Sequence, residues 1–243
     1  PFHKTGNAEL SYLTKDELAV LDVIASNIND RPVYFAVTCR PDKMLGLDDY
    51  MQLEGLGLRI TPIKSQSEQG LYVYGYGRVN TDLLYDNVMN KFKWGNFDTH
   101  PTFIDRSYGP SVQSMRVVML RGARRLNDKG EKDKAVALIE KYLASFPHYN
   151  FPYDWNTMQM LSIMIQAGGY EKAKPHLQTL ANETKQQLTF LTGLNPELTG
   201  KDSTFGQDME LFMNVKDLLI RTVESQKDEA FKKELETMFE PFK

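Results

Sequence analysis

The chain has 243 residues, of which 41% are hydrophobic and 25% are charged, a composition typical of a globular protein. Its formal net charge of −3 excludes the polybasic attraction by which many proteins bind nucleic acid or anionic membranes. A single cysteine, Cys39, excludes an intramolecular disulfide, and no apolar run is long enough to predict a transmembrane helix. Because the chain begins with Pro1 rather than methionine and shows no secretory leader, we expect a fragment of a longer protein.

The first predicted elements are a helix and a strand. Thr14 and Glu17 have the spacing of a capping box, which predicts a helix from there to about Asn29. Residues 31–38 follow as a short, continuous run of apolar and β-branched side chains. Such a run is typical of a strand buried on both faces, so we expect a central strand with Pro32 at its start.

The rest of the first hundred residues continues this alternation of helices and strands. We expect a short amphipathic helix over residues 47–53 and a second strand over 56–63. A third strand is expected over 71–76, where aliphatic residues alternate with tyrosines, and a helix over 82–93. The glycines of the 55–57 stretch lack the pattern of a phosphate-binding loop and predict a turn or a bulge.

Residues 113–191 contain two copies of one helical hairpin. The stretch Gly130 to Ala135 recurs, 38 residues later, as Gly168 to Ala173, and each copy ends one apolar helix pattern and begins another. Ala123, Ala135 and Pro147 stand twelve residues apart, a skeleton that resembles a tetratricopeptide repeat. The second copy departs from this skeleton at its outer two positions.

A third helical pair follows a loop at residues 192–203, with an apolar pattern that includes Phe212, Leu219, Phe231 and Leu235. The predicted fold class is therefore α+β. We expect a small α/β domain of about three strands with helices in residues 1–100, and an all-α, tetratricopeptide-like domain of helical hairpins in residues 101–243.

Few residues are candidates for a catalytic or metal-binding role. The four histidines are far from one another and from Cys39, and no nucleophile motif is present, so we expect no metal site, no cofactor and no catalytic residue. Asp48, Asp49 and Glu54 place three carboxylates close together in sequence, which acid–base catalysis would need. Acidic residues on a short helix more often form a solvated face.

Four ordered stretches carry a family resemblance: LDVIA at 21–25, RPVYFA at 31–36, GLDDYMQLEGL at 46–56 and LYDNVMNKFKWG at 84–95. They resemble the C-terminal region of a bacterial family of polytopic membrane proteins that is similar to protein O-mannosyltransferases and was long a domain of unknown function. In such glycosyltransferases the lipid-linked sugar donor and the catalytic acidic residue belong to the membrane half, which this chain lacks.

The resemblance implies a non-catalytic domain on the periplasmic side of the inner membrane. Its role would be to dock an acceptor or partner protein, or to brace the membrane domain of its own parent chain. Within this interpretation Arg31, Tyr50, Glu54, Lys91 and Trp94 are the candidate ligand- or partner-binding residues, and Arg31 and Glu54 are expected to form a charge-assisted pair. Packing is the alternative role for all five.

Two other functions remain open from the sequence. The helical hairpins of a free-standing adaptor protein could bind a peptide, with the α/β part as scaffold. A small carbohydrate-active enzyme could use the carboxylates at residues 48–54, in which case substitution of Glu54 by glutamine would abolish turnover without changing the fold.

Overall fold

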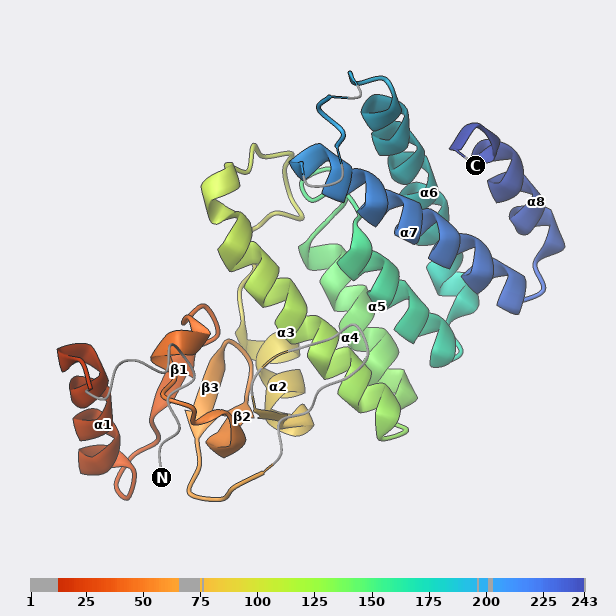
Figure 1. Cartoon of the computed structure of the whole chain (residues 1–243). Helices are drawn as coiled ribbons and strands as arrows, with labels where there is room; N and C mark the ends of the chain where they lie inside the picture. The colour runs from red at the N-terminus through yellow and green to blue at the C-terminus, as the bar shows by residue number, and fades with distance from the viewer. Residues whose placement is uncertain (1–12, 66–74, 76, 196, 201–202, 243) are drawn as a thin grey trace. The chain divides into compact units, whose positions relative to one another are not determined.

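A computed structural model describes residues 13–65, 75, 77–195, 197–200 and 203–242 (Figure 1). The helices are α1 (Lys15–Asn27), α2 (Thr81–Asp86), α3 (Gly109–Asp128), α4 (Lys132–Ser145), α5 (Trp155–Gln166), α6 (Tyr170–Thr192), α7 (Thr204–Ser225) and α8 (Glu229–Met238). The strands are β1 (Tyr34–Ala36), β2 (Met51–Leu53), β3 (Gly57–Ile60) and β4 (Arg78–Val79). Short turns of 3-10 helix occur at Pro41–Lys43, Asp48–Tyr50, Arg106–Tyr108 and Glu240–Phe242, and α2 continues as a π-helical turn at Asn87–Lys91.

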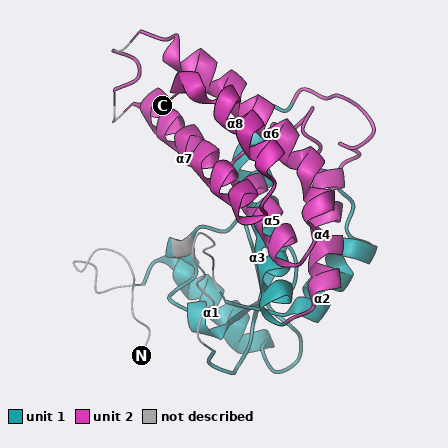
Figure 2. Ribbon diagram, turned by 90° about the vertical axis from the view of Figure 1, so that its right-hand side faces the viewer, with its two compact units in different colours: residues 1–94, 104–129 teal, residues 95–103, 130–243 magenta. Residues whose placement is uncertain are grey.

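The chain divides into two compact units (Figure 2). The first unit comprises residues 1–94 and 104–129 and contains the sheet with α1, α2 and α3. The second comprises residues 95–103 and 130–243 and contains α4 to α8. The two helices of the first predicted hairpin, α3 and α4, thus belong to different units. The domain boundary predicted between residues 100 and 101 stays a prediction.

The sheet of the first unit is mixed, with the strand order β1-β3-β2-β4. Strands β1 and β2 each pair antiparallel with β3, and β2 pairs in parallel with β4. Strand β3, predicted from residues 56–63, is confirmed, with Pro62 beyond its end. The glycine-containing turn is also confirmed, because residues 54–56 connect β2 to β3 and Gly55 has a φ of 126°.

Two predictions for this unit are wrong. Strand β1 is not central but lies at the edge of the sheet, with Tyr34 and Ala36 exposed, because β3 is its one partner in the described sheet. Residues 47–53 do not form a helix. One 3-10 turn leads into β2, whose backbone is paired on both sides by β3 and β4, and these pairings outweigh a short local helical pattern. The predicted strand at 71–76 lies largely outside the described residues.

The helix boundaries follow local sequence signals. Glu17 Oε2 accepts a hydrogen bond of 2.7 Å from the backbone N–H of Thr14, the carboxylate half of the predicted capping box. Helices α3 and α5 end just before Gly130 and Gly168, which have φ values of 81° and 95°. A left-handed residue after a helix is favourable for glycine, so both predicted helix ends are confirmed.

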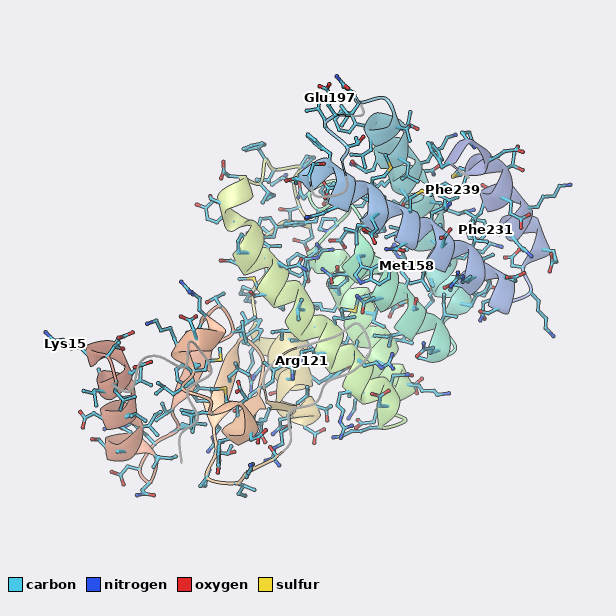
Figure 3. The ribbon with its side chains drawn as sticks, in the orientation of Figure 1. Lys15, Arg121, Met158, Glu197, Phe231 and Phe239 are labelled. Carbon is cyan, nitrogen blue, oxygen red and sulfur yellow. The ribbon has the colours of Figure 1, made fainter. Side chains whose placement is uncertain are left out.

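The second unit is built from packed helices. Helix α5 packs against α4, α6 and α7, and α7 packs against α6 and α8, so the second predicted hairpin and the third helical pair are confirmed as packed pairs. Met158 on α5 and Phe231 on α8 are both buried in this unit (Figure 3). Other side chains from the predicted apolar faces are also buried, namely Ala135, Leu138, Ile139, Tyr142, Phe146, Leu161, Leu219 and Leu235.

Helix α3 is joined to the sheet region by a buried arginine. Arg121 is 6% exposed (Figure 3). Its Nη2 donates a hydrogen bond of 2.6 Å to the carbonyl oxygen of Gly77, one residue before β4. Gly122 follows it in the helix, and a Cβ there would come within 2.4 Å of Leu84 on α2. The hydrogen bond from Arg121 and the absence of a side chain at Gly122 therefore position α3 within the first unit.

Candidate functional site

The two faces of the sheet differ sharply in chemistry. The strand register places Tyr34 beside Arg59, Arg59 beside Gln52, and Gln52 beside Arg78. Directly paired residues lie on the same face of a sheet, so these four polar side chains form one row across all four strands. The alternate positions carry apolar residues on the other face, namely Phe35, Met51, Leu53, Leu58, Ile60 and Val79.

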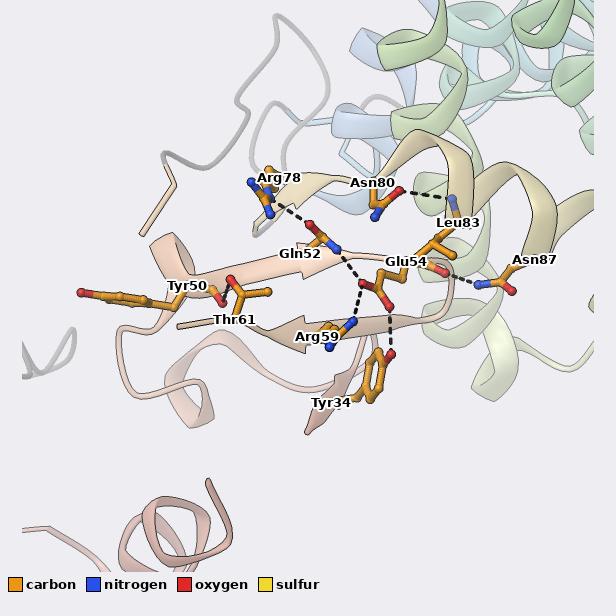
Figure 4. Close-up of polar contacts among 10 residues, drawn as sticks. All are labelled: Tyr34, Tyr50, Gln52, Glu54, Arg59, Thr61, Arg78, Asn80, Leu83 and Asn87. Carbon is orange, nitrogen blue, oxygen red and sulfur yellow. Dashed lines mark hydrogen bonds and ion pairs between the residues drawn. The ribbon is translucent and has the colours of Figure 1, made fainter. Parts of the chain in front are cut away.

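Glu54 is the centre of this polar face, one position beyond the end of β2 (Figure 4). Glu54 is only 7% exposed. Gln52 Nε2 donates to Glu54 Oε1 at 2.6 Å and Tyr34 OH donates to Glu54 Oε2 at 2.8 Å, while Arg59 Nη1 lies 3.7 Å from Oε1. Arg78 Nε completes the row with a hydrogen bond of 2.9 Å to Gln52 Oε1. The buried carboxylate is thus compensated by an amide, a hydroxyl and a cation.

The hydrogen bonds around Glu54 connect several elements of the first unit. Burial, followed by the hydrogen bond to Glu54, raises the pKa of the Tyr34 hydroxyl, which therefore stays protonated and donates to the carboxylate at neutral pH. The backbone carbonyl of Glu54 accepts a further hydrogen bond from Asn87 Nδ2, which joins the network to the end of α2.

Removal of the Glu54 carboxylate is expected to destabilise the first unit. We expect Glu54→Ala to lower the free energy of unfolding of this unit by about 2 kcal/mol, because the buried donor of Gln52 and the half-exposed donor of Tyr34 lose their acceptor. Tyr34→Phe removes one donor at a half-exposed position and should cost less than about 1 kcal/mol. Chemical denaturation followed by Trp94 fluorescence, with Trp155→Phe as the background, measures both losses. A Glu54→Ala variant as stable as the unsubstituted chain would contradict this description of the network.

The structure does not bring the five sequence-predicted residues together. Arg31 is exposed and is not among the partners of Glu54 in the described residues, because Arg59, on the paired strand, supplies the cation instead. The ring of Tyr50 extends away from the Glu54 network in Figure 4. Lys91 is exposed and pairs with Asp86, and Trp94 packs edge-to-face on the ring of Phe92 with centroids 5.9 Å apart. Whether these residues bind a partner stays a prediction.

The other two candidate carboxylates, Asp48 and Asp49, lie in the 3-10 turn that precedes β2. Asp49 pairs with Lys64 at 3.3 Å, and its backbone carbonyl accepts a hydrogen bond of 2.7 Å from the N–H of Ser65. Burial, with a smaller contribution from the charge of Asp49, raises the pKa of the Asp48 carboxyl. These residues line or adjoin a pocket between α1 and the sheet, which is described below.

A second polar cluster, in the helical unit, was not predicted from the sequence. His148 Nδ1 lies 3.1 Å from Glu183 Oε1, and Tyr153 OH lies 2.8 Å from His176 Nδ1. Glu183 also accepts a hydrogen bond from the backbone N–H of Tyr153, so it joins the segment between α4 and α5 to α6. Burial raises the pKa of the Glu183 carboxyl, and burial followed by the charge of His148 lowers the pKa of His176.

The lowered pKa of His176 predicts a dependence of stability on pH. The folded state disfavours the proton that the unfolded state accepts near the ordinary pKa of 6.5, so acidification through pH 6.5 should destabilise the helical unit. The raised pKa of Glu183 has the opposite effect at lower pH. We therefore expect His176→Asn, which keeps an acceptor for Tyr153, to show a smaller loss of melting temperature than the unsubstituted chain between pH 7.5 and 6. His100→Asn, at an exposed position, is the control, and identical pH profiles for all three proteins would contradict the assignment.

The described part of the chain shows neither a cluster of metal ligands nor a helix suited to span a membrane. Among the residues that the structure describes, no three or more histidine, cysteine or acidic side chains lie where they could hold a metal ion. No helix in the described part of the chain combines the length and the apolar character needed to cross a bilayer.

Comparison with known proteins gives a match over part of the chain. Residues 6–83 match the family model described as TMEM260-associated domain 2. TMEM260 is a membrane protein family that resembles O-mannosyltransferases. No curated protein and no solved structure matches the chain. The matched stretch contains α1, all four strands and the whole row of polar residues around Glu54, so this part of the chain is similar to a domain associated with a glycosyltransferase-related membrane protein.

Proposed function

We propose that the chain is a non-catalytic region of a membrane-embedded, glycosyltransferase-like protein, on the periplasmic side of the inner membrane. The observation that carries the proposal is the match of residues 6–83 to a TMEM260-associated domain. In this proposal sugar transfer takes place in the polytopic part of the parent protein. The present region docks an acceptor or partner protein, or braces the membrane domain.

A non-catalytic role is supported by the local partners of two of the three candidate carboxylates. Glu54 is enclosed by Tyr34, Gln52 and Arg59, and Asp49 is paired with Lys64. Acid–base catalysis by a pair of carboxyl groups requires that they face a common substrate with separated pKa values. Here the two carboxyl groups instead have local partners, an arrangement that stabilises a fold.

The helical unit offers a surface for docking. A groove of about 500 Å³ lies beside α6 and α8 and is lined by Lys185, Ala230, Lys233, Glu234, Thr237 and Met238. Lys185, Lys233 and Glu234 are exposed. The groove presents more positive than negative charge, which suits a protein segment that carries acidic side chains.

The test compares two kinds of acceptor in the parent protein in its native membrane. If the region docks acceptors, its deletion, or the pair Lys185→Glu and Lys233→Glu, should lower transfer to folded secreted proteins by about tenfold. Transfer to short peptides should change little, since loss of remote binding raises KM for the docked substrate alone. The pair Lys132→Glu and Arg221→Glu, at exposed positions on α4 and α7, is the matched control.

Each other outcome identifies a different role. Loss of transfer to both kinds of acceptor on deletion, with the groove variant unaffected, would favour a brace for the membrane domain. Unchanged transfer to both acceptors after deletion would contradict the proposed function and favour a separate adaptor. Turnover of a carbohydrate substrate by the isolated chain would contradict it in favour of an enzyme.

A further inference from the structure

The face of α1 that is turned toward the sheet leaves a pocket between the helix and the sheet. Leu21, Ile24 and Ile28 point to a pocket of about 590 Å³ whose other walls include Leu47, Ile60 and Pro62. Leu21, Ile24 and Ile28 are only half-buried, and Glu17 is the one buried residue within α1. Pockets of 300 to 1,000 Å³ with apolar walls and a few polar groups are typical of small-molecule sites. The apolar stripe of α1 therefore lines a pocket of the size that small molecules occupy.

The mouth of the pocket carries one paired cation and anion. Asp49 and Lys64 both line it and lie 3.3 Å apart, with their side chains 42% and 68% exposed. Their segments are held together by backbone bonds, from Thr61 N–H to the carbonyl oxygen of Tyr50 at 2.8 Å and from Ser65 N–H to that of Asp49 at 2.7 Å. The mouth thus presents a hydrogen-bond donor beside an acceptor.

This pair selects the polar part of a ligand. A hydroxyl group can donate to the Asp49 carboxylate and accept from the Lys64 ammonium without separating the two charges. A ligand carboxylate would have to compete with Asp49 for Lys64, and a ligand cation would have to compete with Lys64 for Asp49. The mouth is therefore complementary to an uncharged, hydroxylated group.

We propose that this pocket binds an uncharged amphiphile, with its apolar chain between α1 and the sheet and its hydroxyl groups at Asp49 and Lys64. The apolar walls supply affinity by removing the chain from water, and the charged pair supplies selectivity. This inference does not depend on the proposed function, because it rests on the walls and the mouth of the pocket alone.

Calorimetric titration of the full chain with three ten-carbon probes, each below its micelle concentration, tests the proposal. We expect 1,2-decanediol to bind more tightly than decanoate or decyltrimethylammonium. Ile24→Trp should fill the pocket and weaken binding of the diol by about tenfold, as expected for a blocked apolar site. Val23→Trp, on the same helix at a position that is 52% exposed, should leave the affinity unchanged. Equal melting temperatures of the two variants would show that α1 is intact in both.

The mouth is tested by a change of selectivity. Asp49→Asn leaves Lys64 without its anion, so the preference should shift toward decanoate. Lys64→Gln leaves Asp49 without its cation and should shift the preference toward decyltrimethylammonium. Absence of diol binding, or equal affinities of Ile24→Trp and Val23→Trp, would overturn the pocket assignment. Selectivity that neither mouth substitution alters would overturn the assignment of the polar group.

Discussion

Phe146→Ala is expected to lower the free energy of unfolding of the helical unit by about 4 kcal/mol, the cost of truncating a buried phenylalanine. Phe146 is 2% exposed. Its ring lies 5.7 Å from the ring of Tyr142 and 5.3 Å from that of Phe151, and Phe151 in turn lies 5.0 Å from Phe97. The substitution removes the middle of this chain of rings and leaves a cavity that its rigid neighbours cannot fill.

The measurement is chemical denaturation followed by the fluorescence of Trp155, with Trp94→Phe as the background so that the signal reports on one unit. Phe103→Ala is the control, because Phe103 belongs to the same unit but is 88% exposed. Its effect should stay within about 0.5 kcal/mol. A loss below about 1 kcal/mol for Phe146→Ala would mean that the ring is not packed as described.

Gly77→Ala is expected to destabilise the first unit by about 3 kcal/mol, through backbone strain and overpacking together. Gly77 has a φ of 72°, which L-residues with a Cβ rarely adopt, and a Cβ there would lie 2.5 Å from the carbonyl oxygen of Met51. Relief of this clash would displace the backbone of Met51 at the start of β2, next to its pairing with β4. The same movement would disturb the acceptor of Arg121.

A matched substitution separates the two causes. Gly130→Ala has the same left-handed strain, with a φ of 81°, but nothing lies within 4 Å of its added Cβ. It should therefore cost only about 1 kcal/mol. Denaturation curves for both variants, followed by Trp94 fluorescence for Gly77→Ala and Trp155 fluorescence for Gly130→Ala, measure the difference. Equal losses would show that the contact with Met51 contributes nothing.

The features that the sequence predicts correctly are local. The capping box at Thr14 and Glu17 and the helix ends at Gly130 and Gly168 depend on side chains and backbone angles within one turn, so the pattern of a few residues determines them. The packed pair of α5 and α6 follows from two apolar stripes joined by a short turn. The spacing of apolar residues therefore predicts the helical part of the fold.

The features that the sequence does not reveal depend on distant partners. A continuous apolar run at residues 31–38 is compatible with a central or an edge strand, and pairing with β3 alone places β1 at the edge. Strand β4 has two residues and arises from its pairing with β2. The pairing of Arg59 with Glu54 depends on the register between two strands. The contact of His148 with Glu183 joins residues that are 35 positions apart in the sequence. The spacing of residues along the sequence does not predict such long-range contacts.

Glu54→Gln in the parent protein tests whether Glu54 stabilises the fold of a region that acts by binding. The amide keeps the shape of the side chain but removes the charge that Arg59 and Tyr34 compensate. We would measure sugar transfer and the melting temperature of the same preparation. We expect a lowered melting temperature with transfer unchanged at temperatures where the protein stays folded. Transfer abolished at an unchanged melting temperature would contradict this expectation and make Glu54 a catalytic group.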